Sequence, residues 1–268
     1  MLNKLLTLAQ QAGDVVLSVY NQQGVFVTQK VDGSALTEAD RLSHELICST
    51  LAAAYPNIPI ISEESKTQQP YEERQHWKRF FLIDPLDGTR EFLERNGEFT
   101  VNIALVEDGL PCLGIIHAPA LGMTYFAEKI KGAYKLFEGK ITALRAKPQD
   151  PQTLRVVTSR SHINEDTRQF LDQLTLNGQT IALKPIGSAL KFGLLAEGLA
   201  DLYPRLAPTM EWDTAAGHAI INEIGGKVLI QNTQMPLQYN KAELVNPGFV
   251  ALANEQLLAF IPSMSKIC

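Results

Sequence analysis

Hydrophobic residues recur along the first half of the chain with two different spacings, which predict a mixture of helices and strands. Over residues 2–16, leucine, alanine and valine lie three or four positions apart, as on one face of an amphipathic helix. A second helix is predicted over 41–54, since segment 37–40 resembles a capping box and Pro56 closes the run. Apolar or alternating runs predict strands, the later ones forming an antiparallel meander, at 25–27, 58–61, 80–83, 99–105, 113–116, 123–127 and 132–137.

The second half alternates more regularly between the two kinds of element. Segment 145–152 is polar and twice interrupted by proline, so we place the boundary of two halves there, at 1–146 and 147–268. Beyond it, strands are predicted at 154–157, 181–186, 202–203, 228–230 and 249–252, and helices at 165–174, 190–199 and from Trp212 to Gly225-Gly226. This alternation predicts a layered fold of the α/β or α+β class. In the first half, the polar segment 66–77 is predicted to be a surface loop or lid.

Composition narrows the possible partners. The 268 residues carry a net charge of −5, which argues against a surface that binds nucleic-acid polymers. Cys48, Cys112 and Cys268 are odd in number and form no CxxC pattern, so zinc and a disulfide framework are not expected, and a reducing cytoplasm is. Neither a signal-peptide hydrophobic segment nor a transmembrane run is predicted. No basic amphipathic helix indicates peripheral association with the inner membrane, which the sequence leaves open. The sequence leaves the oligomeric state open.

The first candidate for chemistry is the hexapeptide Asp84-Pro85-Leu86-Asp87-Gly88-Thr89. The buried strand at 80–83 is predicted to end in this stiff turn, which can direct both acids to one side. Two adjacent carboxylates repel each other unless a cation lies between them, and their hard oxygens suit Mg²⁺. Thr89 adds a hydroxyl within reach of a metal-bound water. The same residues also suit an ordinary acidic turn, and the hexapeptide alone does not decide between the two interpretations.

Further acidic residues lie at predicted junctions between secondary-structure elements. Glu63-Glu64 follows the strand at 58–61, and Asp213 stands at the start of a predicted helix. A glutamate pair in such a place is commonly just solvated. Asp40 suits helix capping, and it also suits the role of a proton acceptor for a group that the fold brings close. From its own segment, capping is the simpler interpretation.

Taken together, three segments resemble the inositol monophosphatase-like, lithium-sensitive phosphatase superfamily. They are Glu63-Glu64-Ser65, the hexapeptide at 84–89, and the run from Trp212 to Gly217. Other segments are similar to its subgroup of 3'(2'),5'-bisphosphate nucleotidases of the bacterial CysQ type: 75–77, 95–105, 159–162 and 187–192. The resemblance implies a layered αβαβα sandwich, of the inositol monophosphatase and fructose-1,6-bisphosphatase-like type, with the active site between the halves. It implies hydrolysis of adenosine 3',5'-bisphosphate (PAP) to AMP and phosphate, and of 3'-phosphoadenylyl sulfate as a further substrate.

The resemblance also implies roles for individual residues. Glu63, Asp84 and the backbone carbonyl of Leu86 would bind one Mg²⁺, and Asp84, Asp87 and Asp213 a second, with a third ion also conceivable and Li⁺ as inhibitor. Thr89 and Asp40 would activate the attacking water, so the implied catalytic residues are Glu63, Asp40 and Thr89. The backbone amides of Gly88 and Thr89 would hold the phosphate. The substrate contacts implied in full are Glu63, Leu86, Asp87, Gly88, Thr89, Ser159, His162, Gly187, Lys191 and Asp213.

Most metal ligands thus fall in the first half, and the nucleotide contacts with the last ligand fall in the second. Lys191 is the implied partner of the phosphate that is not cleaved, with Arg205 as a looser candidate beside it. On its own segment, Lys191 is more simply interpreted as a solvated helix charge, and His162 equally suits a surface or capping residue.

Two other classes of function and one other mechanism compete with the metal-dependent nucleotidase. An inositol monophosphatase or a sugar phosphatase would use the same metal chemistry on another substrate. A catalytic aspartate, Asp84 or Asp87, could form a phosphoenzyme, although metal binding accounts for both acids better. A protein of a different class, a non-catalytic sensor of nucleotide or metal, would not need Thr89 and the complete set of acids.

Overall fold

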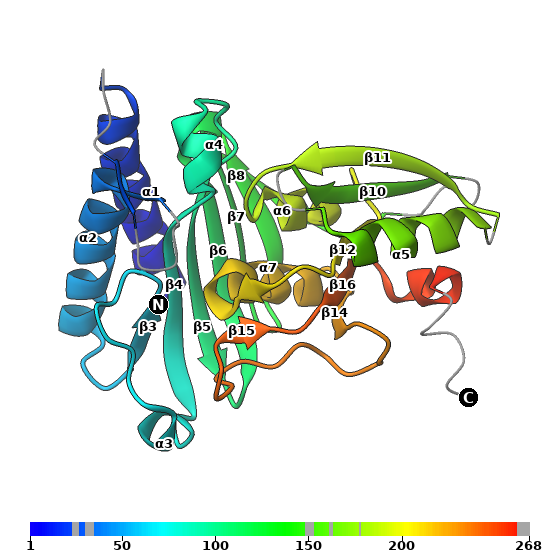
Figure 1. The fold of residues 1–268 in the computed structure, drawn as a ribbon. Coiled ribbons are helices and arrows are strands. Elements are labelled where there is room, and N and C mark those ends of the chain that lie inside the picture. Colours follow the sequence, from blue (N-terminus) through cyan, green and yellow to red (C-terminus); the bar gives the residue numbers. More distant parts are fainter. Residues whose placement is uncertain (23–26, 30–34, 148–152, 161–162, 177, 262–268) are drawn as a thin grey trace.

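The computed structural model describes residues 1–22, 27–29, 35–147, 153–160, 163–176 and 178–261. Two sheets and three groups of helices form successive layers. Figure 1 shows α1 and α2, the first sheet, and then α6 and α7 from left to right, with the second sheet and α5 together on the right. Helices α1 (Leu2–Tyr20) and α2 (Glu38–Ala54) cover the outer face of the first sheet. Helices α6 (Leu190–Ala196) and α7 (Glu211–Glu223) lie between the sheets, and α5 (Glu165–Leu176) packs on the second sheet. The predicted αβαβα sandwich is confirmed.

The first sheet has seven strands in the order β3-β4-β5-β6-β7-β8-β9. Strands β3 and β4 are parallel, and every later neighbour is antiparallel, which confirms the predicted meander. Sequence periodicity did not predict β9, because its side chains are mostly exposed and mix polar with apolar types. The strands are β3 (Ile60–Ser62), β4 (Arg79–Asp87), β5 (Thr100–Glu107), β6 (Leu110–Ala118), β7 (Met123–Glu128), β8 (Gly132–Phe137) and β9 (Lys140–Leu144).

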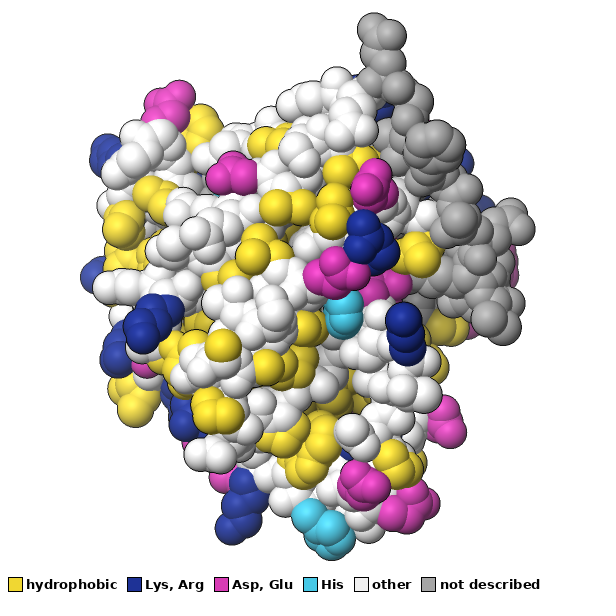
Figure 2. Space-filling view, turned by 90° about the vertical axis from the view of Figure 1, so that its left-hand side faces the viewer, with side chains coloured by type: hydrophobic (Ala, Val, Ile, Leu, Met, Phe, Trp, Pro, Cys, Tyr) yellow, Lys and Arg dark blue, Asp and Glu magenta, His cyan; other side chains and the backbone are white. Residues whose placement is uncertain are grey.

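Helix α1 packs on this sheet through the stripe that its spacing predicts. Leu5, Leu8, Ala12 and Val16 are all buried, in one core with apolar residues of α2 and of strands β4, β5 and β6. Burying a leucine or valine of this kind stabilises the fold by about 1.5–3 kcal/mol each. Figure 2 views the side of the molecule that carries α1 and α2, where charged side chains of both signs and hydrophobic side chains are dispersed among polar ones.

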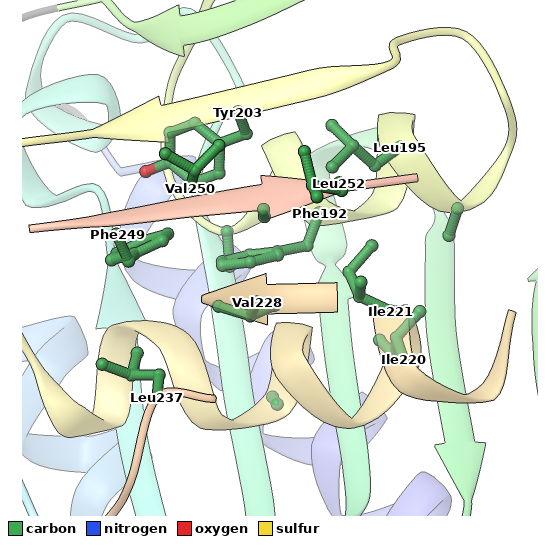
Figure 3. Close-up of a cluster of buried hydrophobic side chains, with 14 of the residues drawn as sticks. Phe192, Leu195, Tyr203, Ile220, Ile221, Val228, Leu237, Phe249, Val250 and Leu252 are labelled. Atoms are coloured by element: carbon green, nitrogen blue, oxygen red, sulfur yellow. The ribbon is translucent and has the colours of Figure 1, made fainter. Parts of the chain in front are cut away.

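The opposite face of the first sheet is covered by α7, which approaches unusually closely. A Cβ on Gly114 of β6 would lie 2.2 Å from the carbonyl oxygen of Ala216 in α7, so only glycine fits there. Helices α6 and α7 also face the second sheet, where Phe192, Tyr203 and Phe249 pack ring against ring (Figure 3). One continuous core therefore joins the two sheets.

The second sheet has five strands in the order β11-β10-β12-β16-β14, with parallel and antiparallel pairs. Its strands are β10 (Thr153–Ser159), β11 (Thr180–Ile186), β12 (Leu202–Arg205), β14 (Lys227–Ile230) and β16 (Phe249–Leu252). All strands of the first sheet precede segment 145–152 in the chain, and all strands of the second sheet follow it. The order of the chain therefore matches the proposed halves. The division into two domains stays a prediction, since α7 packs on both sheets. No helix within the described residues is long and apolar enough to cross a membrane.

Several predicted boundaries need correction. Strand β4 does not end before the hexapeptide but continues to Asp87. Helix α6 stops at Ala196 rather than Leu199, because Gly198 has a positive φ of 66° that breaks the helix. The predicted strand at 25–27 lies mostly outside the described residues. The remaining short elements are β1 (Val27–Gln29), β2 (Ala35–Thr37), α3 (Tyr71–Arg74), α4 (Thr89–Leu93), η1 (Pro119–Leu121), β13 (Thr209–Met210), β15 (Val245–Asn246) and η2 (Glu255–Phe260).

Segment 66–77 is anchored to the second half. Its short helix α3 ends in Arg74, which is 3% exposed. The Arg74 guanidinium donates hydrogen bonds to Asn240 Oδ1 at 2.8 Å, to the Lys241 carbonyl at 3.1 Å and to the Ala242 carbonyl at 3.0 Å. Segment 66–77 therefore connects the two halves through Arg74. The part around Arg74 is held in place by these bonds, so the lid interpretation is wrong for it.

Candidate active site

A β-bulge in β4 brings the two acids of the hexapeptide together. In a regular strand, side chains three positions apart point to opposite faces of the sheet. Here Asp84 pairs with Asn102 and Asp87 pairs with Thr100, so β4 gains one residue over β5 between the two acids. The extra residue rotates Asp87 relative to Asp84. Two hydrogen bonds stabilise the bulge. The Leu86 amide donates to Asp84 Oδ1 at 3.1 Å within the bulge, and the Ser43 hydroxyl of α2 donates to the Pro85 carbonyl at 2.8 Å.

Three elements contribute carboxylates to one cluster. Glu63 follows β3, and its amide donates to the Ile83 carbonyl, which holds it beside Asp84 on β4. Asp213 stands in the first turn of α7, where its Oδ2 accepts a hydrogen bond from the Met210 amide at 2.9 Å. Carboxylate oxygens of Glu63, Asp84 and Asp213 lie within 4.8 Å of one another. Because hard oxygen donors converge from three directions, this set fits a divalent cation such as Mg²⁺.

Without a cation, the cluster is electrostatically strained. Burial raises the pKa of Asp84 well above its ordinary value, and repulsion from Glu63, Asp87 and Asp213 raises it further. Burial and the same repulsion raise the pKa of Asp213. Burial also raises the pKa of Asp87 to about 6, although the nearby Lys191 ammonium lowers it. The folded protein thus holds several carboxyl groups that ionise reluctantly unless positive charge is added.

We expect the metal-free protein to lose stability as the pH rises through these pKa values. For Asp87, the folded pKa of about 6 exceeds the ordinary 3.8, so its contribution is complete in acid and is lost by about pH 6. Mg²⁺ binds the ionised form, so the stabilisation by Mg²⁺ should grow over the same range. Thermal unfolding with EDTA and with Mg²⁺, at about pH 4.5 and about pH 7, measures both effects. A Mg²⁺-induced shift in Tm of equal size at both pH values would contradict this account.

Asp40 caps a helix and also lies close to the Thr89 hydroxyl, while its role as a proton acceptor stays a prediction. Its Oδ2 caps α2 by accepting hydrogen bonds from the Thr37 amide at 2.8 Å and the Thr37 hydroxyl at 2.6 Å. Its other oxygen, Oδ1, lies 3.5 Å from the hydroxyl of Thr89, the first residue of α4. Thr89 follows Gly88, whose φ of 91° makes the sharp turn that glycine allows. A buried carboxylate, fixed by its cap, therefore faces the threonine hydroxyl at the edge of the acid cluster.

Beside the cluster lies a cavity of about 200 Å³ between the two sheets. Its walls combine the hexapeptide with parts of the second half, which the sequence alone cannot place side by side. Among the predicted residues, the cavity is lined by Asp87, Gly88, Thr89, Ser159, Lys191, Arg205 and Asp213. One cavity is therefore lined by acids of the site and by cations from both halves, the latter being Arg90, Lys191 and Arg205.

Lys191 lies at the inner wall and is 4% exposed. Its Nζ donates to the Ile186 carbonyl at 3.2 Å and to the Ser188 carbonyl, and it lies 5.2 Å from the centre of the Tyr203 ring. Burial lowers its pKa to about 8, although Asp87 raises it. The solvated helix charge is therefore excluded as a description of Lys191, and a buried cation facing the cavity is what the structure contains.

Comparisons with known proteins agree with this geometry. A family model described as the inositol monophosphatase family matches residues 1–261. The chain belongs to the inositol monophosphatase family. Members of this family are metal-dependent phosphatases that typically use Mg²⁺, and the acid cluster of Glu63, Asp84 and Asp213 fits that requirement.

Within the inositol monophosphatase family, the predicted subgroup is also supported. The chain is 43% identical over 251 residues to the 3'(2'),5'-bisphosphate nucleotidase CysQ of Escherichia coli (strain K12), covering 93% of this chain and 98% of that protein. The crystal structure of CysQ from Bacteroides thetaiotaomicron is similar with a TM-score of 0.82 and 38% identity, covering 92% of this chain and 95% of that one. An inositol monophosphatase from Zymomonas mobilis has a TM-score of 0.73 and 27% identity, covering 97% and 94%. The predicted resemblance is confirmed.

Not every predicted site residue can be placed, and some neighbours were missed. His162 lies outside the described residues, and the ligand role of the Leu86 carbonyl stays a prediction. Sequence reasoning missed Asn102, which donates to Asp87 Oδ2 at 3.3 Å, and Glu91, Phe192 and Tyr203, which line the cavity. Asn102 lies in a segment that resembles the subgroup and is a polar residue in an otherwise apolar strand. A buried polar side chain in such a strand needs a hydrogen-bond partner, and this signal could have indicated that Asn102 belongs to the site.

Proposed function

We propose that this member of the inositol monophosphatase family is a Mg²⁺-dependent 3'(2'),5'-bisphosphate nucleotidase that hydrolyses PAP to AMP and phosphate. 3'-Phosphoadenylyl sulfate is a further proposed substrate. The CysQ relatives that match nearly the whole chain support this activity. The observation that carries it is the composition of one cavity, which is lined by the cations Lys191 and Arg205 as well as by the acids Asp87 and Asp213. A substrate with two phosphates suits such a lining, with one phosphate bound through the metal at the acids and the other contacting Lys191 and Arg205.

The residues of the chain have distinct tasks in this reaction. Glu63, Asp84 and Asp213 would bind Mg²⁺ together with Asp87 and the Leu86 carbonyl, and bound Mg²⁺ supplies positive charge to the phosphoryl oxygens and lowers the pKa of water. Asp40 accepts a proton through the Thr89 hydroxyl, which orients the attacking water. The amides of Gly88 and Thr89 donate to the phosphate that is cleaved.

We expect Thr89→Ala to lower kcat while leaving KM nearly unchanged. The hydroxyl contact to Asp40 is made at 3.5 Å in the free protein, and such contacts tighten as the transition state forms. The loss should be on the order of 10²-fold, as for other general acid–base groups. Steady-state kinetics with PAP measure it, and Thr89→Ser, which keeps the hydroxyl, is the matched control. A rise in KM with kcat preserved would show that Thr89 serves binding alone.

Two or three Mg²⁺ ions and inhibition by Li⁺ are also part of the proposal, because the family resemblance implies two ligand sets that share Asp84. We expect Li⁺ to inhibit by replacing one Mg²⁺. Titration of activity with Li⁺ at fixed Mg²⁺, compared with Na⁺ at equal ionic strength, tests this. If Li⁺ and Na⁺ act alike over the millimolar range, the lithium-sensitive character is wrong, although the phosphatase assignment would stand.

A substrate panel tests the proposed function itself. We expect phosphate release from PAP to depend on Mg²⁺ and to exceed release from inositol 1-phosphate in kcat/KM. The alternative, an inositol monophosphatase, is favoured by the similarity to the Zymomonas mobilis structure and predicts the opposite order. A non-catalytic sensor predicts binding without any phosphate release.

We further propose that the protein acts in the reducing cytoplasm, which the sequence predicts. Cys48 and Cys112 are free thiols in the structure. Burial raises the pKa of the Cys48 thiol to about 11, so it is held in the less reactive protonated form. The oligomeric state stays open.

A further inference from the structure

Two segments that carry no catalytic assignment meet at the rim of the active-site cavity. Glu98 lies just before β5 in the first half, and Arg160 directly follows Ser159 at the end of β10 in the second half. Their side chains form a two-point ion pair, in which Arg160 donates to Glu98 Oε1 at 2.7 Å and to Glu98 Oε2 at 3.1 Å. Both lie in segments that resemble the nucleotidase subgroup rather than in the metal-binding segments, so the contact joins the halves near the nucleotide side of the site.

Glu98 also holds the loop that precedes α6. Its Oε2 accepts a hydrogen bond from the Gly187 amide at 2.8 Å. Gly187 has no room for a side chain, since a Cβ there would lie 2.6 Å from Glu91 Cγ and 2.8 Å from the Glu98 carbonyl oxygen. Arg160 completes the contact by donating to the Pro185 carbonyl at 3.3 Å. One carboxylate therefore fixes two second-half segments at once, the end of β10 and the loop at 186–188.

The loop needs such support because of its backbone conformation. Ser188 has a φ of +47°, a conformation that costs a non-glycine residue free energy. Lys191 Nζ donates to the carbonyl groups on either side of Gly187, so the position of this buried cation depends on the loop. Glu98 supports the loop by accepting the hydrogen bond of the Gly187 amide, whereas Lys191, which can only donate, bonds to the carbonyl groups of Ile186 and Ser188.

We propose that Glu98 and Arg160 are positioning residues that determine selectivity for a nucleotide with a second phosphate. They clamp Ser159 and the 186–188 loop against the turn at Gly88, where a Cβ would lie 3.2 Å from the Glu98 carbonyl oxygen. This inference rests on the proposed function, because it concerns the part of the cavity that would bind the phosphate that is not cleaved. Neither Glu98 nor Arg160 is among the three carboxylates that form the metal cluster.

Kinetics should therefore separate binding from chemistry. We expect Arg160→Gln and Glu98→Ala to raise KM for PAP about tenfold or more, the effect typical of residues that orient a ligand-binding group, with kcat changed less than about twofold. KM for inositol 1-phosphate, which has a single phosphate, should stay unchanged. Glu98→Gln keeps an acceptor for the Gly187 amide but loses the ion pair, so it should fall between wild type and Glu98→Ala.

The matched control is Arg41→Gln, since Arg41 forms an equally short ion pair with Glu45 on the exposed side of α2. It should leave both substrates unaffected. In the double variant Glu98→Gln with Arg160→Gln, the rise in KM should match the larger single effect, because the pair acts as a unit. Equal losses for both substrates, a fall in kcat instead of a rise in KM, or additive effects would overturn the proposal.

Hydrogen exchange tests the clamp independently of catalysis. Amide exchange in peptides covering 185–190 should become faster in Arg160→Gln and Glu98→Ala than in wild type, and remain unchanged in Arg41→Gln. Unchanged exchange in the loop would overturn the clamp even if PAP is the substrate. If exchange rises as expected but wild type releases no phosphate from PAP, the proposed function fails while the clamp itself stands.

Discussion

Replacing Asp84 by asparagine is expected to abolish most catalysis and, at the same time, to stabilise the metal-free protein. Turnover of PAP should fall by about 10³-fold or more, the size of effect seen when a preorganised group at the reacting centre is lost. Asparagine retains an oxygen to accept the hydrogen bond from the Leu86 amide, so the bulge should persist. Burial and repulsion from Glu63, Asp87 and Asp213 raise the pKa of Asp84, and a neutral amide at this position avoids both costs, so Tm in EDTA should increase.

Glu64→Gln is the matched control for Asp84→Asn. Glu64 follows Glu63 directly but lies outside the three-carboxylate group of the described residues. Its replacement should leave turnover and the Mg²⁺-induced rise in Tm near wild type. In Asp84→Asn, Mg²⁺ should raise Tm much less than in wild type. Near-normal turnover with an intact Mg²⁺ effect on Tm would show that the cluster does not bind the catalytic metal.

Lys191→Met should reduce kcat/KM for PAP by about ten- to hundredfold. The estimate corresponds to roughly 1.5–3 kcal/mol for a hydrogen bond to a charged group. Lys191 is buried at the cavity wall, where its ammonium can attract a phosphate and donate a hydrogen bond to it. A substrate whose single phosphate is bound at the acids cannot make this contact. Hydrolysis of inositol 1-phosphate should hardly change. Measuring both substrates under the same metal concentration gives the selectivity ratio directly.

Lys184→Met, on the exposed part of β11, removes a lysine charge from the same half and should leave the ratio unchanged. Because the pKa of Lys191 is lowered to about 8, the advantage of wild type over Lys191→Met in kcat/KM should shrink as the pH rises through about 8. An equal loss on both substrates would mean that Lys191 supports the 186–188 loop and the site as a whole, not the choice of substrate.

Much of the fold could be predicted from periodicity, because most elements bury one face. The stripe along α1 and the alternating strands of the meander have distinct spacings, so their kind and order are confirmed. Elements that bury little were missed, and β9 is the clearest example. The division of the core between the sheets could not be predicted, since it depends on α7 fitting against Gly114 from a distant part of the chain.

The candidate site was predicted as separate acidic segments, each ambiguous alone. What the sequence could not provide is their juxtaposition: the bulge that turns Asp87, the buried wall around Lys191, and the Glu98–Arg160 contact between residues that are 62 positions apart. Charged residues such as Glu98 and Arg160 are common on surfaces, and only the position of their partners distinguishes a clamp from two solvated side chains.

The central claim, that this protein removes the 3'-phosphate of PAP with Mg²⁺, is tested most directly by ³¹P NMR of PAP incubated with the purified protein and Mg²⁺. Our account predicts that the 3'-phosphate signal declines while inorganic phosphate and the 5'-phosphate signal of AMP appear in equal amounts, and that EDTA stops the reaction. Release of the 5'-phosphate, leaving adenosine 3'-phosphate, or the absence of phosphate release with folded, Mg²⁺-loaded protein would contradict it.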